Sequence, residues 1–227
     1  MNACRETALH VAAEKGQSDV VNVLINAKAN MEIKDESHKT PVSLAAENGY
    51  LVTVNALIDA KACLNPDGCM PLYYAAQNGH TSIVQVLIEA KANVVFTDVF
   101  WNPLPSAAEN GYAAIVQMLV DAKANIDVKH GTGGPALHLA TEQGHNSVIY
   151  VLLNAKANVN AVNDESKTPL HWAAEMGHSA IVQVFVDAKA NVDAIDKSNM
   201  TPLHYAAAEN VKCEILQILL NTRRKQA

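Results

Sequence analysis

Ala155-Lys156-Ala157-Asn158 is one of five copies of a tetrapeptide that recurs along this chain of 227 residues. Ala60-Lys61-Ala62-Cys63 is a near copy, and it fills the one gap in the series of full copies, which begin at Ala27, Ala90, Ala122, Ala155 and Ala188. Successive lysines of the six copies are 33, 30, 32, 33 and 33 residues apart. A fixed period near 33 residues predicts a stack of small segments, because one such segment cannot bury its apolar face alone.

The dipeptide Thr168-Pro169 shows how each repeating segment begins. It opens a short apolar stretch that ends in Ala173-Ala174, and Gly177 follows. Thr is a preferred N-cap, Pro is favoured as the first helical residue, and Gly commonly ends a helix. A second amphipathic stretch, residues 181–186, runs on toward Lys189, and polar turn residues come after it. Each repeat is therefore predicted to be a helix, a tight turn, a second helix and an extended hairpin loop.

Residues 168–178, Thr-Pro-Leu-His-Trp-Ala-Ala-Glu-Met-Gly-His, resemble the core signature of the ankyrin repeat, as do residues 136–140 and 201–207. The resemblance recurs in register along the chain. It implies an all-α solenoid, an ankyrin-repeat stack of helix-turn-helix units joined by β-hairpin loops. It also implies one domain over residues 1–227, with repeats at 1–39, 40–69, 70–101, 102–134, 135–167, 168–200 and 201–227. Members of this family mostly bind other proteins on a concave face built from hairpin tips and first helices.

Several positions depart from the family pattern. Lysine stands where the family usually has the glycine that ends the second helix in a left-handed conformation. A left-handed lysine costs roughly 1 kcal/mol relative to glycine. We expect these lysines to compensate by reaching the last carbonyls of the helix and opposing its dipole, with a functional basic row as the alternative. At the cap position, Thr is replaced by Met70 and Pro135.

Charge and hydropathy exclude several classes of protein. The net charge is −6, from 17 Lys and Arg against 23 Asp and Glu. This acidic balance differs from the strongly basic balance of a nucleic-acid binder. No apolar run approaches the roughly 18–20 residues of a membrane span. The first residues do not form a signal peptide, although a secretion signal could precede them in a longer protein. We expect a cytoplasmic monomer, delivered into a host cell if the chain is part of an effector.

Seven of the nine histidines are explained by the repeat rather than by a metal, and the other two, His38 and His130, lie in predicted hairpins. His10, His138, His171 and His204 hold the signature position and are expected to form hydrogen bonds at the helix start. His80, His145 and His178 follow the glycine and are expected to cap the turn between helices. No two histidines have ligand spacing with a carboxylate, so no metal site is predicted.

No residue set predicts an enzyme or a cofactor site. The glycine-rich stretch 129–134 precedes a helix, but it lacks the buried strand and the Lys-Ser/Thr of a phosphate-binding loop, so it is interpreted as a hairpin tip. Cys63 and Cys69 bracket a tight turn and could pair, but two reduced thiols fit an intracellular protein better. The chain is predicted to be non-enzymatic, with no cofactor.

The third hairpin holds the strongest signal for a binding site. Phe96, Phe100 and Trp101 stand where residues 163–167 form a polar tip in another repeat. Large aromatic side chains on an exposed tip are typical of binding hot spots. The alternative is that Phe96 and Phe100 fold back over the shortened hairpin before them. We expect Trp101 to be the more exposed side chain.

A row of mostly acidic residues follows the Ala-Ala pairs of the first helices, and near it lie the aromatic residues Tyr74, Trp172 and Tyr205. The row consists of Glu14, Glu47, Gln77, Glu109, Glu142 and Glu175. An acidic groove with aromatic anchors suits a partner protein with basic and apolar side chains. The alternative is that the row serves solubility and helix charge balance.

The sequence therefore predicts a protein–protein interaction module or scaffold that binds through its concave face and hairpin tips. The alternative is a structural or targeting segment of a larger effector, toxin or channel whose activity lies elsewhere.

Overall fold

The computed structural model describes residues 5–65, 70–95, 100–131, 133–208 and 213–226. Its contacts divide the chain into two compact units. The N-terminal unit is Met1–Phe96 with Asp121–Ala124, and the C-terminal unit is Thr97–Val120 with Asn125–Ala227. The described elements are almost entirely helical, which confirms the all-α fold class.

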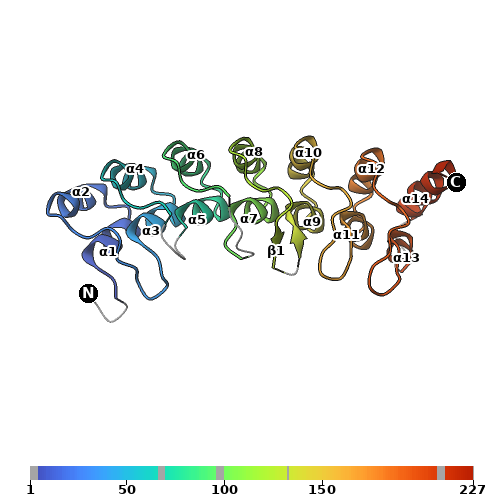
Figure 1. The fold of residues 1–227 in the computed structure, drawn as a ribbon, viewed down its shortest axis with the longest axis horizontal. Coiled ribbons are helices and arrows are strands. Elements are labelled where there is room, and N and C mark those ends of the chain that lie inside the picture. The colour runs from blue at the N-terminus through green and yellow to red at the C-terminus, as the bar shows by residue number, and fades with distance from the viewer. Residues whose placement is uncertain (1–4, 66–69, 96–99, 132, 209–212, 227) are drawn as a thin grey trace. The chain divides into compact units, whose positions relative to one another are not determined.

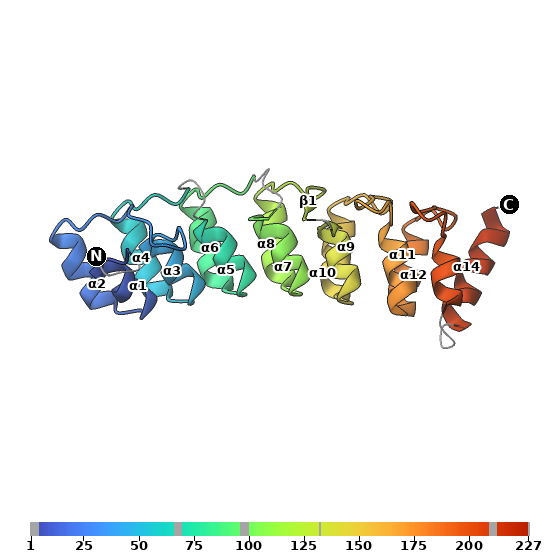
Figure 2. The same ribbon diagram turned by 90° about the horizontal axis from the view of Figure 1, so that it is seen from below.

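In the N-terminal unit, three helix pairs stack in order, each made of a seven-residue helix and a nine-residue helix. The pairs are α1 (Ala8–Glu14) with α2 (Ser18–Asn26), α3 (Pro41–Glu47) with α4 (Leu51–Asp59), and α5 (Pro71–Gln77) with α6 (Thr81–Glu89). First helices pack on first helices and second helices on second helices, so the unit has two layers (Figures 1 and 2).

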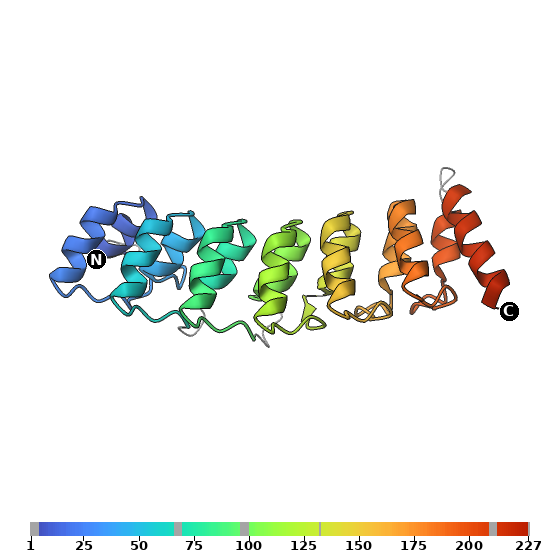
Figure 3. The same ribbon diagram turned by 90° about the horizontal axis from the view of Figure 1, so that it is seen from above.

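The C-terminal unit repeats this arrangement. Its pairs are α7 (Pro103–Glu109) with α8 (Ala113–Asp121), α9 (Ala136–Glu142) with α10 (Asn146–Asn154), α11 (Pro169–Met176) with α12 (Ser179–Asp187), and α13 (Pro202–Ala207) with α14 (Cys213–Gln226). Figure 3 shows its second helices running side by side from α8 to α14. Before α9, strands β1 (Lys129–His130) and β2 (Gly134–Pro135) pair antiparallel as a short hairpin.

The predicted start signals lie where the helices begin. Thr40, Thr168 and Thr201 are extended N-cap residues, each followed by Pro in the first turn. Met70 and Pro135 occupy the same cap position, as the alignment of the repeats predicts. The helix starts are therefore set by local sequence, because Thr-Pro fixes both the cap and the first helical residue.

The core consists of small and branched side chains that let helices approach closely. Ala173 and Ala174 are fully buried where α11 packs against its neighbours. Gly111 has a φ of +80°, and a Cβ built there would lie 2.8 Å from Cε1 of His145 on the next helix pair. Only glycine fits this turn, because both the backbone and the neighbouring ring exclude a side chain.

All six repeated lysines have left-handed backbones, with φ between 61° and 69°. Their side chains are exposed. In the described part of the chain these side chains form no hydrogen bond with a helix carbonyl. The backbone does so instead, since N–H of Lys156 donates to the carbonyl of Leu153 (3.0 Å) and N–H of Ala157 donates to that of Leu152 (3.0 Å). The expected contact between lysine side chain and carbonyl is thus absent from the described residues.

Helix α14 has 14 residues and reaches Gln226, so it is longer than the nine-residue second helices before it. The other second helices stop before an Ala-Lys pair with a left-handed lysine, whereas Thr222-Arg223-Arg224 continues the helix here. Basic residues in the last turn favour this extension, because they oppose the negative end of the helix dipole.

Candidate partner-binding surface

The first-helix row is not uniformly acidic, because lysines pair with some of its carboxylates. In the C-terminal unit, Lys167 Nζ lies 3.0 Å from Glu175 Oε2 and 3.6 Å from Glu165 Oε2. Glu109 is exposed and Glu142 is half-buried, and neither forms an ion pair or hydrogen bond with its side chain in the described structure. Glu109 and Glu142, on the packed helices α7 and α9, are therefore the carboxylates of this unit's row that a partner could engage.

Lys167 is the centre of an aromatic cluster. Its side chain is 11% exposed, and Nζ lies 4.9 Å from the ring centroid of Trp172 and 4.6 Å from that of Tyr205. Burial disfavours the charged ammonium, but Glu175 and then Tyr205, through hydrogen bonds and charge, together outweigh burial and raise the pKa of Lys167. The cation stays charged at neutral pH and holds both rings in place.

Tyr205 is fixed from a second direction by Asp196. The Tyr205 hydroxyl donates to Asp196 Oδ2 (2.6 Å), while Asp196 Oδ1 accepts from the backbone N–H groups of Ser198 and Met200. Burial and this hydrogen bond raise the pKa of Tyr205. Burial alone would raise the pKa of Asp196, but the donors, led by Tyr205, lower it. Trp172, Glu175 and Tyr205 thus lie around Lys167, each half-buried, and the sequence analysis did not single out this lysine.

The N-terminal unit has the same cluster in smaller form. Lys39 Nζ donates to Glu47 Oε1 (2.7 Å) and lies 4.8 Å from the ring centroid of Tyr74. Tyr74 is only 5% exposed and meets Tyr73 edge to face at 5.3 Å between centroids. The prediction that Tyr74 is a surface anchor is therefore wrong, because a lysine and a second aromatic ring cover it.

The third hairpin exposes aromatic side chains. Phe100 is 63% exposed and Trp101 is 41% exposed. The prediction that Trp101 is the more exposed of the two is wrong. Trp101 adjoins Asn102, a cap residue that is 2% exposed and whose Oδ1 accepts from N–H of Leu104 (3.2 Å). Phe96, the other predicted aromatic residue, lies outside the described residues.

Three of the four signature histidines, His10, His138 and His171, join their helix start to the next hairpin. His171 Nδ1 lies 3.0 Å from the backbone nitrogen of Thr168 and 2.8 Å from its Oγ1. His171 Nε2 lies 3.1 Å from the Met200 carbonyl oxygen, which can only accept, so Nε2 carries the proton. His10 and His138 bond the carbonyls of Lys39 and Lys167 in the same way.

The second set of histidines does not cap the turn between helices. His80, His145 and His178 are N-cap residues without a side-chain cap bond. Within each unit the ring instead reaches the preceding repeat, as where His145 Nε2 lies 2.9 Å from the carbonyl oxygen of Glu109. These histidines therefore connect neighbouring repeats. No group of three His, Cys, Asp or Glu in the described residues could hold a metal ion.

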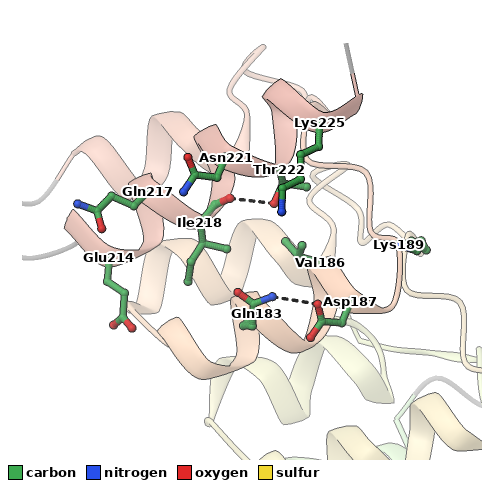
Figure 4. A pocket seen from close by; sticks show the side chains of 10 residues that line it. All are labelled: Gln183, Val186, Asp187, Lys189, Glu214, Gln217, Ile218, Asn221, Thr222 and Lys225. Atoms are coloured by element: carbon green, nitrogen blue, oxygen red, sulfur yellow. Dashed lines mark hydrogen bonds between the residues drawn. The ribbon is translucent and has the colours of Figure 1, made fainter.

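A cavity of about 520 Å³ lies between α12 and α14 (Figure 4). Val186 and Ile218 give it an apolar part, and its carboxylates and ammonium groups come from Asp187, Glu214, Lys189 and Lys225. Gln183 donates to Asp187 (2.9 Å), so one carboxylate is already occupied. The sequence did not single out this cavity, since each lining residue looks like an ordinary solvated helix position.

Comparison with known proteins identifies the repeat. A family model described as ankyrin repeats in three copies matches residues 1–65, 53–130 and 137–226. No curated protein matches the chain. Among the described residues, no helix is long and apolar enough to cross a membrane.

Two solved structures show the same fold. The crystal structure of the human ASB11 ankyrin repeat domain is 24% identical with a TM-score of 0.84, over 96% of this chain and 98% of that chain. The ankyrin repeat domain of Bcl-3, a unique member of the IkappaB protein family, is 24% identical with a TM-score of 0.80, over 95% of this chain and 98% of that chain. The family match covers most of the sequence, and the chain belongs to the ankyrin-repeat family.

Proposed function

We propose that this chain is a protein-recognition module that binds one partner protein through its C-terminal unit. Ankyrin-repeat domains generally mediate protein–protein interaction. The observation that carries the proposal is the exposure of Phe100 (63%) and Trp101 (41%) at one hairpin. Exposed aromatic residues are costly in water and are enriched at binding hot spots.

The partner's chemistry follows from the charges near this hairpin. Phe100 and Trp101 precede α7, and Glu109 ends it, so the aromatic pair and this carboxylate are separated by one helix of about 10 Å. Glu142 occupies the same position on α9. A partner segment with an apolar anchor followed by basic side chains matches this arrangement. Its basic residues would meet Glu109 and Glu142 rather than Glu175, which Lys167 already neutralises.

The remaining predicted residues form the edge of this surface. Trp172 and Tyr205 are half-buried and held by Lys167, so they offer apolar contact without rearrangement. Such fixed side chains lower the ordering cost of binding. The proposal includes no catalysis, and it takes the protein to act in the cytoplasm.

Affinity capture from cell lysate tests the proposal. The bait is the wild-type chain, a Phe100→Ala/Trp101→Ala variant, or a Tyr150→Ala variant as the control. Tyr150 is 53% exposed on α10, so its removal deletes a comparable ring elsewhere in the same unit. A partner that is retained by wild type and the control but lost by the double variant supports the proposal. A partner retained equally by all three baits contradicts it.

A further inference from the structure

Lys167 shows how the first-helix surface holds a cation. Its Nζ donates to Oε2 of Glu175 (3.0 Å), and this glutamate lies eight residues after the lysine. The same Nζ lies 4.9 Å from the ring centroid of Trp172 on α11 and 4.6 Å from that of Tyr205 on α13, which packs against α11. A carboxylate and an aromatic ring together stabilise an ammonium or a guanidinium group, through charge and through the negative face of the ring.

The N-terminal unit has an equivalent site. Lys39 Nζ donates to Oε1 of Glu47 (2.7 Å), again eight residues later, and lies 4.8 Å from the ring centroid of Tyr74 on the next first helix, α5. Each unit therefore holds a cation between a glutamate near the end of one first helix and an aromatic side chain on the next first helix.

The repeat of α9 has the glutamate and the aromatic ring of such a site. Glu142 is the last residue of α9, and Trp172 lies on α11, which packs against α9. Trp172 follows Glu142 by 30 residues, as Tyr205 follows Glu175. Glu142 and Trp172 are both half-buried, so part of each side chain is open to a partner. The register of the repeats thus relates Trp172 to Glu142 as it relates Tyr205 to Glu175.

The lysine of such a site is missing from this repeat for a structural reason. Gly134 stands eight residues before Glu142 and has a φ of +92°. A Cβ built there would lie 3.0 Å from Cγ of His138, so the position excludes a lysine. Lys129, on the hairpin before α9, is bound to Asp164 (2.8 Å). Within the described part of the chain, Glu142 therefore lacks the cation that its counterparts hold.

We propose that Glu142 and Trp172 bind one arginine side chain of the partner protein, in the place that Lys167 fills in the following repeat. This inference rests on the proposed function, because the arginine belongs to the partner that the C-terminal unit recognises. Arginine suits the site better than lysine, since its planar guanidinium stacks on an aromatic ring, forms two parallel hydrogen bonds with a carboxylate and is more weakly hydrated.

The charges around the site favour a further cation beside Lys167. Lys167 also contacts Trp172, but Glu175 (3.0 Å) and Glu165 (3.6 Å) neutralise its ammonium group. With Glu142 included, the carboxylates of this group outnumber its ammonium group. An added guanidinium therefore meets net attraction rather than repulsion.

Nuclear magnetic resonance with a small arginine probe tests this site. The chain has two tryptophans, so ¹⁵N spectra show two indole N–H signals, and a Trp101→Phe variant assigns the signal of Trp172. The probe is the acetylated and amidated tripeptide glycyl-arginyl-glycine. Its matched control has citrulline in place of arginine, which keeps the shape of the side chain but has no charge. The arginine peptide should shift the Trp172 signal in a saturable way and bind at least about threefold more tightly than the citrulline peptide.

Two variants locate the binding. Glu142→Gln should weaken binding of the arginine peptide at least about threefold, because it removes the carboxylate but keeps the size of the side chain. Glu214→Gln, at an exposed position of α14, removes the same charge elsewhere in the unit and should bind like wild type. The inference is overturned if the arginine peptide leaves the Trp172 signal unchanged or binds no better than the citrulline peptide. It is also overturned if Glu142→Gln binds like wild type, or if Glu214→Gln weakens binding as much.

These results are separate from those of the capture experiment. If the peptide binds as expected while the Phe100→Ala/Trp101→Ala variant keeps its partner, the arginine site stands and the proposed function fails. If that double variant loses its partner but the peptide does not reach Trp172, the proposed function stands and the arginine site is wrong.

Discussion

Replacing Pro135 with threonine should stabilise the protein, because it restores a helix cap that one repeat has lost. In the repeats whose first helix is capped by Thr7, Thr168 or Thr201, the histidine Nδ1 lies 3.0–3.2 Å from the backbone nitrogen of the threonine and 2.8 Å from its Oγ1. Pro135 has neither the N–H nor the hydroxyl. Nδ1 of His138 is therefore buried without a hydrogen-bond partner.

The expected gain follows from two opposing terms. A buried acceptor left without a partner costs about 1–3 kcal/mol. Removing the proline makes the unfolded chain more flexible, and this lowers the free energy of unfolding by about 0.4–1 kcal/mol. The backbone already suits threonine, since Pro135 has φ −64° and ψ 167° while Thr168 has φ −89° and ψ 166°. Pro135→Thr should therefore raise the free energy of unfolding by about 1–2 kcal/mol.

Urea unfolding followed by circular dichroism measures this gain, and thermal unfolding should show a rise of about 2–4 °C per kcal/mol. Pro135→Ala is the matched control, because it restores the backbone donor without the hydroxyl, and it should give a smaller gain than Pro135→Thr. Equal or lower stability for the threonine variant would refute the reasoning, since it would mean that the buried nitrogen of His138 carries no penalty.

Three further predictions concern pH and the left-handed backbone positions. Burial lowers the pKa of His138 from 6.5 to about 4, so the unfolded chain binds a proton before the folded chain does, and stability should fall by up to about 3 kcal/mol as the pH drops from 6.5 to 4. His138→Gln should flatten that part of the stability–pH curve. Gly111→Ala should destabilise by about 1–3 kcal/mol in urea unfolding, because the added Cβ meets the ring of His145 on a left-handed backbone. Lys156→Gly should stabilise by about 1 kcal/mol in the same assay, while Lys156→Ala should change little.

Local sequence predicted the helix starts. Thr168-Pro169 sets a cap and a first turn through bonds within four residues, so its structure hardly depends on the rest of the chain. The repeat register then placed Met70 and Pro135 at caps, although neither is a good cap residue. The family resemblance marked Lys156 as a position where a left-handed glycine is usual, and the φ of Lys156 is 68°.

The surface was harder to predict, because it depends on contacts between hairpins and helices. In the sequence, Glu47 and Glu175 looked equivalent to Glu109. In the structure, each of the two accepts a hydrogen bond from a lysine eight residues before it, at the end of the preceding hairpin. That spacing, shared by Lys39 and Lys167, was a signal that could have been found. The exposure of Phe100 relative to Trp101 had no such signal, since both are large aromatic residues at adjacent positions of the same hairpin.

Isothermal titration calorimetry with the captured partner tests the central claim most directly. The chain is titrated as wild type, as Phe100→Ala/Trp101→Ala and as the Tyr150→Ala control. If the third hairpin is the anchor, the double variant should bind at least about 30-fold more weakly, which corresponds to a hot spot of about 2 kcal/mol, while the control binds like wild type. Binding by the double variant within about twofold of wild type, well below the tenfold change that 1.4 kcal/mol represents, would contradict the claim.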